Sequence, residues 1–66
     1  MPKNELERLT AREREILCIL AKGCLYKEIA AQLGISPSTV RAHLHAVYCK
    51  LGVKSRTQAA VFFLKH

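Results

Sequence analysis

The sequence predicts an all-α domain of four short helices, and three patterns lead to this prediction. Apolar residues recur at spacings of three and four, the period of a helix with one buried face. Two of the apolar segments follow a Ser or Thr that has Glu or Gln three positions later, a pattern that caps helix starts. Gly23, Gly34 and Gly52 each stand where such a segment ends. The 66 residues make one small domain at most, which buries only about 60% of the surface of its unfolded chain.

Residues 1–8 are polar and mixed in charge, so we expect a loose N-terminal arm or the remnant of a linker there. The domain itself is placed at residues 9–66. A first helix is predicted over residues 11–22. Its start is marked by Thr10 and Glu13, since each side chain can accept a hydrogen bond from the other residue's amide.

A second, shorter helix is predicted over residues 26–33. Ile29, Ala30 and Leu33 share one face of it, opposite its polar residues. Gly34 is expected to end this helix, because glycine enters the left-handed conformation at no steric cost.

The third helix is predicted over residues 37–51. Ser36 is the expected N-cap, and Pro37 suits the first helical position, where its missing amide costs nothing. One apolar stripe along this helix must pack on the first two helices; it consists of Val40, Leu44, Val47 and Leu51.

The last helix is expected to begin after Ser55, which forms a second capping pattern with Gln58, and to run through Leu64. Residues 59–64 are apolar on every side, which exceeds what one small core can cover. Two explanations stay open. The outer face of the helix is either under little constraint, or it is a patch that binds a second copy of the chain.

The net charge of +6 is concentrated in the second half of the chain. Residues 1–33 carry six Lys or Arg and all five Glu, whereas residues 34–66 carry five Lys or Arg and no acidic residue. Such asymmetry favours an anionic partner, and nucleic acid or an anionic membrane are the candidates. A membrane surface is disfavoured because the most apolar helix is not the most basic one.

A membrane span and a secretory signal are both excluded by the pattern of apolar residues. The longest apolar run, residues 59–64, is far shorter than the roughly 20 residues needed to span a bilayer. Lys3 is followed by Asn4, Glu5, Glu7 and Arg8, which are polar or charged where a signal peptide would be apolar. We therefore expect a cytoplasmic protein.

Nothing in the sequence indicates a metal site or catalysis. Cys18, Cys24 and Cys49 are odd in number and lack the Cys-x2-Cys spacing of a zinc site, so reduced thiols are expected. The chain has no Asp, no clustered carboxylates, no glycine-rich phosphate loop and no evident nucleophile triad. The sequence thus predicts neither an enzyme nor a bound cofactor.

Three residues have the spacing of a helix-turn-helix. A small side chain at Ala30 lets the second and third helices cross closely, Gly34 permits a tight turn, and Val40 anchors the third helix in the core. A helical corner with only a packing role shows part of the same pattern. The charge asymmetry favours the alternative, a DNA-binding domain.

With the apolar stripe turned inward, the opposite face of the third helix must meet solvent or DNA. That face consists of Ser38, Arg41, Ala42, His45 and Cys49. Arg41 is the best candidate for a base contact, because a bidentate Arg–guanine pair is the commonest specific contact and is worth about 1–3 kcal/mol. His45 can donate to a purine or a phosphate, and Ala42 can touch a thymine methyl. Since residues 37–51 contain no Asn or Gln, we predict recognition weighted toward guanine and DNA shape.

Contacts to the DNA backbone are expected from hydroxyls, free amides and cations around this face. They would involve Lys27, Ser36, Ser38, Thr39, Lys54 and Arg56. For any single base, a solvated surface charge explains its presence equally well, because phosphate contacts are interchangeable. His43 lies beside the apolar stripe and is interpreted as a packing residue or as one that bonds to nearby backbone.

Over residues 9–66 the sequence also resembles the LuxR-type (GerE/NarL-like) DNA-binding domain of bacterial transcriptional regulators. The matching residues are Leu9-Thr10, Arg12-Glu13, Glu15, Gly23, Lys27-Glu28-Ile29-Ala30, Leu33-Gly34-Ile35-Ser36, Thr39-Val40-Arg41, His43, Lys50-Leu51-Gly52-Val53 and Arg56. Two residues depart from the family pattern. Tyr26 stands where the family favours Asn, and Arg41 stands where it often has Lys.

The resemblance implies a four-helix effector domain of a transcriptional regulator, with the third helix in the major groove of double-stranded DNA. It also implies pairing of two copies through the last helix, where we expect Val61 and Phe62, on half-sites about one helical turn apart. The family usually joins this domain to a receiver domain, as in response regulators, or to a ligand-binding domain, and whether this chain is a fragment or free-standing stays open. RNA polymerase is a further candidate partner, and DNA binding implies association with the nucleoid.

Two other classes of protein compete with this interpretation. Region 4 of sigma factors shares the helix-turn-helix, but it would come attached to polymerase-binding regions that these 66 residues lack. A protein-interaction module, whose basic half meets an acidic protein, would explain the charge without DNA. Engagement of unrelated duplex DNA at low salt distinguishes the second alternative from a DNA-binding domain.

Overall fold

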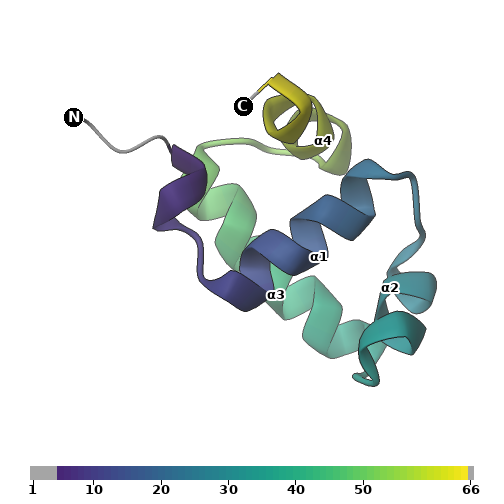
Figure 1. The fold of residues 1–66 in the computed structure, drawn as a ribbon. Helices are drawn as coiled ribbons and strands as arrows, with labels where there is room; N and C mark the ends of the chain where they lie inside the picture. The colour runs from purple at the N-terminus through teal and green to yellow at the C-terminus, as the bar shows by residue number, and fades with distance from the viewer. Residues whose placement is uncertain (1–4, 66) are drawn as a thin grey trace.

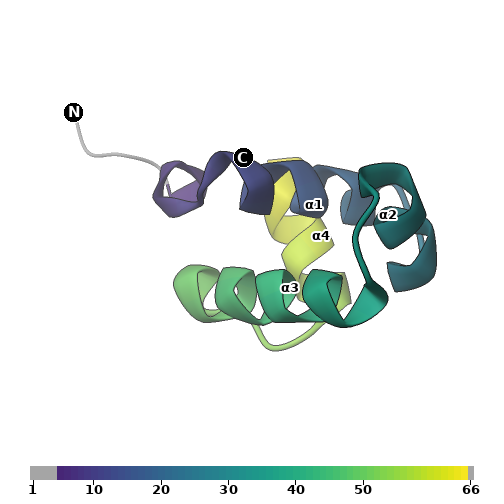
Figure 2. The same cartoon turned by 90° about the horizontal axis from the view of Figure 1, so that it is seen from below.

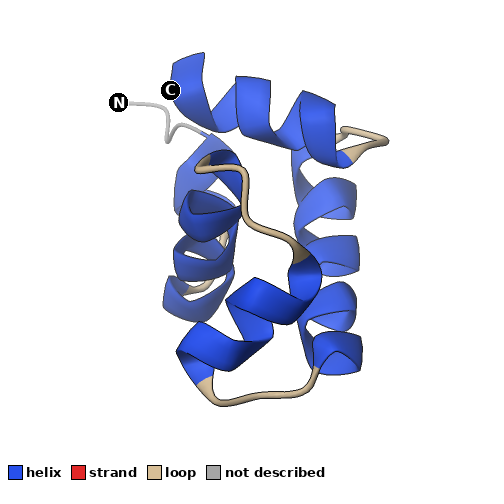
Figure 3. Ribbon diagram, turned by 90° about the vertical axis from the view of Figure 1, so that its right-hand side faces the viewer, coloured by secondary structure: helices blue, strands red, loops and turns tan. Residues whose placement is uncertain are grey.

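The computed structural model describes residues 5–65, and within them the protein has four α-helices and no strand (Figure 1; Figure 3). The helices are α1 (Ala11–Ala21), α2 (Tyr26–Leu33), α3 (Pro37–Leu51) and α4 (Arg56–Lys65). The predicted all-α fold is confirmed, and helix ends agree with the prediction to within a residue. No helix in the described part of the chain has the length and apolarity needed to cross a bilayer.

The segment before α1 is more ordered than the loose arm expected over residues 1–8. Glu5–Arg8 forms one turn of 3-10 helix. Leu6 packs against the hydrophobic core, and its carbonyl accepts a hydrogen bond from the Leu9 amide at 3.2 Å. Burial of this leucine offsets the entropy lost on ordering the turn. Residues 1–4 of the expected arm lie outside the described residues.

The core lies between α1 and α3, which run in separate layers (Figure 2). The four apolar residues of the predicted α3 stripe are each at most 6% exposed. They meet buried residues of the first two helices, namely Ile16, Leu17, Ile19, Leu20, Ile29 and Ala30. In Figure 2, α3 forms one edge of the molecule, and α1 and α2 both lie to one side of it. The opposite side of α3 is therefore not covered by either helix.

Local side-chain caps fix the starts of α1 and α3 as predicted. The Glu13 amide donates to Thr10 Oγ1 at 3.1 Å, and the Thr10 amide donates back to Glu13 Oε1 at 2.9 Å. At α3, the Thr39 amide donates to Ser36 Oγ at 3.2 Å. Each bond satisfies an amide that the first helical turn leaves without an intrahelical partner.

The caps of α4 and α2 differ from expectation. The Gln58 amide donates to Ser55 Oγ at 3.1 Å as predicted, but Gln58 Oε1 accepts from the Lys54 amide at 2.8 Å instead of from Ser55. At α2, which was given no cap in the prediction, Glu28 Oε1 accepts from the Leu25 amide at 2.6 Å. The side chain of Leu25 has no acceptor, so at the start of α2 only the bond to Glu28 forms and no reciprocal bond accompanies it.

The turn between α2 and α3 has the geometry expected of the helix-turn-helix spacing. Gly34 ends α2 in the left-handed conformation, with φ of 68°. The Ile35 amide then donates back to the Ala30 carbonyl at 3.0 Å. Ala30 is 3% exposed and Val40 is fully buried, so both serve the close packing of α2 against α3.

The apolar run of α4 is divided between core and surface. Ala59 is fully buried, and Phe62 and Phe63 pack against the core. By contrast, Val61 is 44% exposed and Leu64 is 72% exposed. Because α4 packs across α1, residues 5–65 cover only one side of its apolar surface.

Candidate nucleic-acid interface

The face of α3 that points away from the core is exposed, as the periodicity of the helix predicted. We call it the outer face of α3; it consists of Ser38, Arg41, Ala42, His45 and Cys49. No described helix covers the side of α3 that points away from the core (Figure 2). A helix with one free side is the element that fits into the major groove of B-DNA.

The three predicted base-contacting residues lie together on this face. Arg41 has no hydrogen bond and no ion pair within residues 5–65, so all five donors of its guanidinium are available to a ligand. His45 Nε2 lies 4.0 Å from Cys49 Sγ, one helical turn further along. Ala42 stands between these residues and adds no bulk, so a surface can approach α3 closely there.

Three exposed hydroxyls gather at the start of α3. Ser36 Oγ lies 3.0 Å from Ser38 Oγ and 2.9 Å from Thr39 Oγ1. The amides of Thr39 and Val40 bond back to the Ser36 carbonyl, but the Ser38 amide has no acceptor within the described residues. A free amide at the positive end of a helix dipole is suited to an anion such as a phosphate.

Two of the predicted phosphate-contacting cations are exposed, and the third is not free. Lys27 on α2 and Lys54 in the loop before α4 are both exposed. Arg56 is half-buried; its Nη2 donates to the Cys24 carbonyl at 2.7 Å, and its Cζ lies 5.9 Å from the centre of the Tyr26 ring. Arg56 therefore ties the start of α4 to the loop before α2. A phosphate contact would have to use its remaining donors.

Lys50 is likewise engaged inside the domain. Its Nζ donates to Glu13 Oε1 at 2.7 Å, and Glu13 is 5% exposed. Burial by itself raises the pKa of Glu13, but the hydrogen bonds from Lys50 and Thr10 and the charge of Lys50 outweigh it, so the pKa lies below its ordinary value. The cations of the basic half that have no partner within the described residues are thus fewer than the sequence suggests.

A pair of tyrosines joins α2 to α3. Tyr26 Oη lies 3.2 Å from Tyr48 Oη, and both residues are half-buried. Burial, the hydrogen bond to Tyr26 and the nearby phenol raise the pKa of Tyr48 above its ordinary value, although the charge of Arg56 opposes them. Tyr48 therefore stays protonated at neutral pH and remains a donor. In the sequence, Tyr26 stands out only as a departure from the family, and no pattern predicts this pair.

These internal partnerships had no local signal in the sequence. Tyr26 and Tyr48 are 22 residues apart, Cys24 and Arg56 are 32 apart, and Glu13 and Lys50 are 37 apart. Capping patterns and helical periodicity act over about four residues, so they do not report such pairs. Only the packing of the four helices brings them together.

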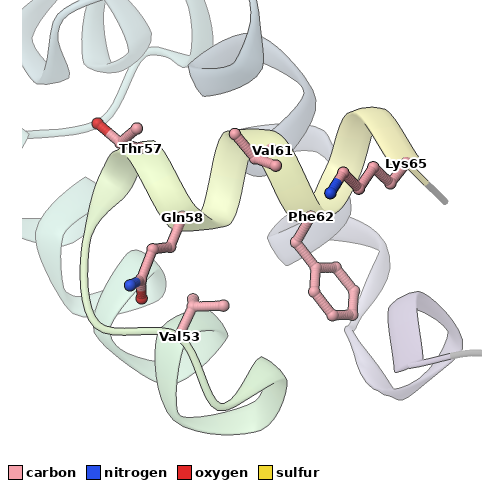
Figure 4. Close-up of a pocket in the computed structure, with 6 residues that line it drawn as sticks. All are labelled: Val53, Thr57, Gln58, Val61, Phe62 and Lys65. Carbon is pink, nitrogen blue, oxygen red and sulfur yellow. The ribbon is translucent and has the colours of Figure 1, made fainter.

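The predicted dimer residues lie on the partly exposed side of α4. Val61 and Phe62 belong to the lining of a shallow hollow of about 350 Å³. The lining consists of Val53, Thr57, Gln58, Val61, Phe62 and Lys65. Figure 4 shows Gln58 and Phe62 pointing from α4 to the side on which Val53 lies. The lining thus combines three apolar side chains with the polar side chains of Thr57, Gln58 and Lys65.

The remaining candidate residues form no metal centre in the part of the chain described. No group of three or more His, Cys, Asp or Glu within residues 5–65 is placed to hold a metal ion. Cys18 and Cys24 are half-buried free thiols, and Cys49 is an exposed one. His43 is half-buried and has no hydrogen bond to any described residue, so the bond to nearby backbone that was one of its two suggested roles is not seen.

Comparisons with known proteins agree with this arrangement. A model of the family described as bacterial regulatory proteins, luxR family, matches residues 7–63. The chain is 54% identical over 57 residues to YhjB of Escherichia coli (strain K12), named as an HTH-type transcriptional regulator; the match covers 86% of this chain and 28% of YhjB. It is 50% identical over 56 residues to the transcriptional regulatory protein LiaR of Bacillus subtilis (strain 168), covering 85% of this chain and 26% of LiaR.

A third relative is named as a response regulator. The chain is 43% identical over 60 residues to the response regulator protein VraR of Staphylococcus aureus (strain NCTC 8325 / PS 47), covering 91% of this chain and 29% of VraR. The chain therefore spans between a quarter and a third of the length of these curated relatives. The family match includes the α2–turn–α3 unit and the whole outer face of α3. The chain belongs to the LuxR family of bacterial regulatory proteins, and it is the helix-turn-helix DNA-binding domain of that family.

Proposed function

We propose that the domain binds double-stranded DNA sequence-specifically as the effector domain of a bacterial transcriptional regulator, with α3 in the major groove. The observation that carries this proposal is the unpartnered Arg41 guanidinium on the uncovered face of α3. A planar guanidinium with free donors pairs best with O6 and N7 of guanine. His45 follows one turn later and supplies a second polar contact, and Ala42 leaves room for a thymine methyl.

Phosphate contacts would hold α3 in the groove from both ends. The free Ser38 amide and the hydroxyls of Ser36, Ser38 and Thr39 support a contact at the N-terminus of α3. Exposed Lys27 and Lys54 support contacts on either side of it. We still propose a phosphate contact for Arg56, but a weaker one, because Arg56 also interacts with the Cys24 carbonyl and the Tyr26 ring.

We further propose that two copies pair through Val61 and Phe62 on repeated half-sites about one helical turn apart. The half-exposed apolar side of α4 supports this, since contiguous exposed apolar surface usually marks an interaction site. The relative named as a response regulator supports a receiver domain as the partner that supplies the signal. RNA polymerase would be the downstream partner. In such a regulator the domain acts in the cytoplasm, on nucleoid DNA, and has no catalytic role.

Selection of bound sequences from random duplex DNA tests the proposal. We expect repeated half-sites that contain guanine. The double variant Arg41→Ala, His45→Ala should keep its helical circular dichroism but lose the sequence preference, because both side chains are exposed and only one weak internal contact is removed. Arg14→Ala, which removes an exposed charge from α1, is the matched control and should retain the preference.

Two outcomes would contradict the proposal. An unchanged preference in the folded double variant would remove α3 from base recognition. Failure of the wild-type domain to engage unrelated duplex DNA at low salt would favour the alternative, a module whose basic surface meets an acidic protein.

A further inference from the structure

The Tyr26–Tyr48 pair lies beside the predicted base contacts. Tyr26 is the first residue of α2. Tyr48 follows His45 by three positions and Arg41 by seven, so the three side chains lie on the same side of α3. The two phenol oxygens, 3.2 Å apart, connect this side of α3 to the start of α2.

Two hydroxyls that face each other share only one hydrogen bond, which leaves one phenol proton unused. Either oxygen can be the donor of this bond. When Tyr48 donates it, Tyr26 accepts, and the proton of Tyr26 is free for another acceptor. Within residues 5–65 Tyr26 Oη has no other hydrogen-bond partner.

The surroundings of this unused donor suit an anionic acceptor. The Arg56 guanidinium carbon is 5.9 Å from the centre of the Tyr26 ring, and the next residue along α2 is the exposed Lys27. One cation therefore lies over the Tyr26 ring, and a second follows Tyr26 directly in α2. The one carboxylate in the same helix, that of Glu28, is already bonded to the Leu25 amide.

We propose that the Tyr26 hydroxyl donates a hydrogen bond to a phosphodiester oxygen of the bound duplex, and that Tyr48 is the positioning residue that orients it. This inference rests on the proposed DNA binding by α3. A phosphate is the acceptor, and not a base, because α2 lies beside α3 and not on its outer face (Figure 1; Figure 2). Tyr26 thus fixes the position of the domain on the duplex without contributing to its sequence preference.

The test compares wild type with Tyr26→Phe and Tyr48→Phe on a duplex obtained by selection. In a series of such duplexes, each phosphate in turn is replaced by a neutral methylphosphonate. The phenylalanine variants keep the rings, and the Tyr26→Phe ring still faces Arg56, so folding is checked by thermal unfolding and is expected to be retained. For the unmodified duplex, Tyr26→Phe should weaken binding about tenfold, the effect expected for a hydrogen bond to a charged group.

The deciding readout is the position of the effect. At one phosphate, neutralisation should weaken wild-type binding but leave Tyr26→Phe binding unchanged, and at all other phosphates the two proteins should respond alike. For Tyr48→Phe, neutralisation of the same phosphate should weaken binding less than it does for wild type. The hydroxyl of Tyr26 is still present in this variant but is no longer oriented. Lys27→Gln is the matched control. Its binding should become insensitive to neutralisation of a different phosphate, the one that Lys27 contacts.

Equal responses of wild type and Tyr26→Phe at every phosphate, with wild type bound, would overturn this inference and leave the proposed function standing. If wild type bound no selected duplex, the proposed function would fail, and this inference with it. A purely structural role for the pair predicts a uniform loss at all positions, which would also overturn the phosphate contact.

Discussion

Lys50 Nζ lies 2.7 Å from Glu13 Oε1, so the last turn of α3 is bonded to the first turn of α1. The same carboxylate oxygen accepts the Thr10 amide at 2.9 Å and so completes the N-cap of α1. One buried side chain thus caps a helix and joins it to the predicted recognition helix. A domain of this size buries a smaller fraction of its surface than larger domains do, so we expect such a link between helices to matter for its stability.

Glu13→Gln should lower the free energy of unfolding by about 1 kcal/mol at pH 7. Glutamine can still accept the Thr10 amide, so the loss is that of a charge-assisted bond to a partly exposed lysine. In a domain of this size the loss corresponds to a fall in Tm of roughly 4–8 °C. Glu15→Gln, which breaks an exposed pair with Arg12, is the matched control and should change Tm little.

The contribution of Glu13 should also disappear in acid. The pKa of Glu13 is lower in the folded protein than in the unfolded chain, where it is about 4.3. The stabilisation is therefore present in full above the unfolded pKa and is lost as pH falls through the lower folded pKa. Thermal unfolding of wild type and Glu13→Gln from pH 7 to pH 2.5 should show the Tm difference shrinking. A constant difference across this range would contradict an ionised Glu13.

Arg56→Ala should destabilise the domain by about 1–2 kcal/mol, measured by urea unfolding. The substitution leaves the Cys24 carbonyl without its guanidinium donor and removes the contact with the Tyr26 ring. Lys54→Ala removes the same charge two residues earlier, where no side-chain partner is present among the described residues, and should leave stability within about 0.5 kcal/mol. Equal stability of the two variants would show that Arg56 is only a surface charge.

The salt dependence of DNA affinity should report how many phosphates each domain contacts. With four to six phosphates neutralised by each domain, the plot of log K against log salt concentration should have a slope of roughly −4 to −5. Lys27→Gln should make this slope shallower by about 0.9 without changing the preferred sequence. Arg14→Gln on α1 should leave the slope unchanged. Fluorescence anisotropy titrations at several salt concentrations measure all three, and a flat response in wild type would exclude an electrostatic interface.

Val61→Glu should weaken pairing on DNA at least tenfold while leaving the fold intact. Val61 is 44% exposed and lines the hollow on α4, so a carboxylate there is tolerated in the monomer but is costly in an apolar interface. Sedimentation velocity with a duplex of two half-sites should show two wild-type copies bound cooperatively and Val61→Glu copies bound independently. Leu64→Glu, on the same helix but outside the hollow, is the control, and cooperative binding by both variants would exclude this interface.

The helices and their ends could be predicted because their signals are local. Thr10 and Glu13 mark the start of α1, Ser36 and Pro37 mark that of α3, and Gly34 ends α2; each acts within one helical turn. The 3-10 turn at Glu5–Arg8 was missed for the opposite reason. A single leucine among polar residues gives no periodicity, and its order depends on the core that it meets.

The candidate interface could be predicted in part. Periodicity alone separates the buried stripe of α3 from the exposed side that carries Arg41 and His45, because one face of an amphipathic helix must turn inward. Periodicity does not tell which exposed cation is free. Lys50 and Arg56 are basic residues of the same half of the chain as Lys54, yet the fold gives both of them internal partners.

The linear order of residues therefore determined four helices, the caps of α1 and α3, the turn between α2 and α3, and the face of α3 that is left uncovered. Each of these depends on neighbours within about one turn of the chain. The tertiary structure alone decided which charges remain available to DNA and that Tyr26 meets Tyr48. Those outcomes depend on the angles at which the helices pack, which bring together side chains 22 to 37 residues apart.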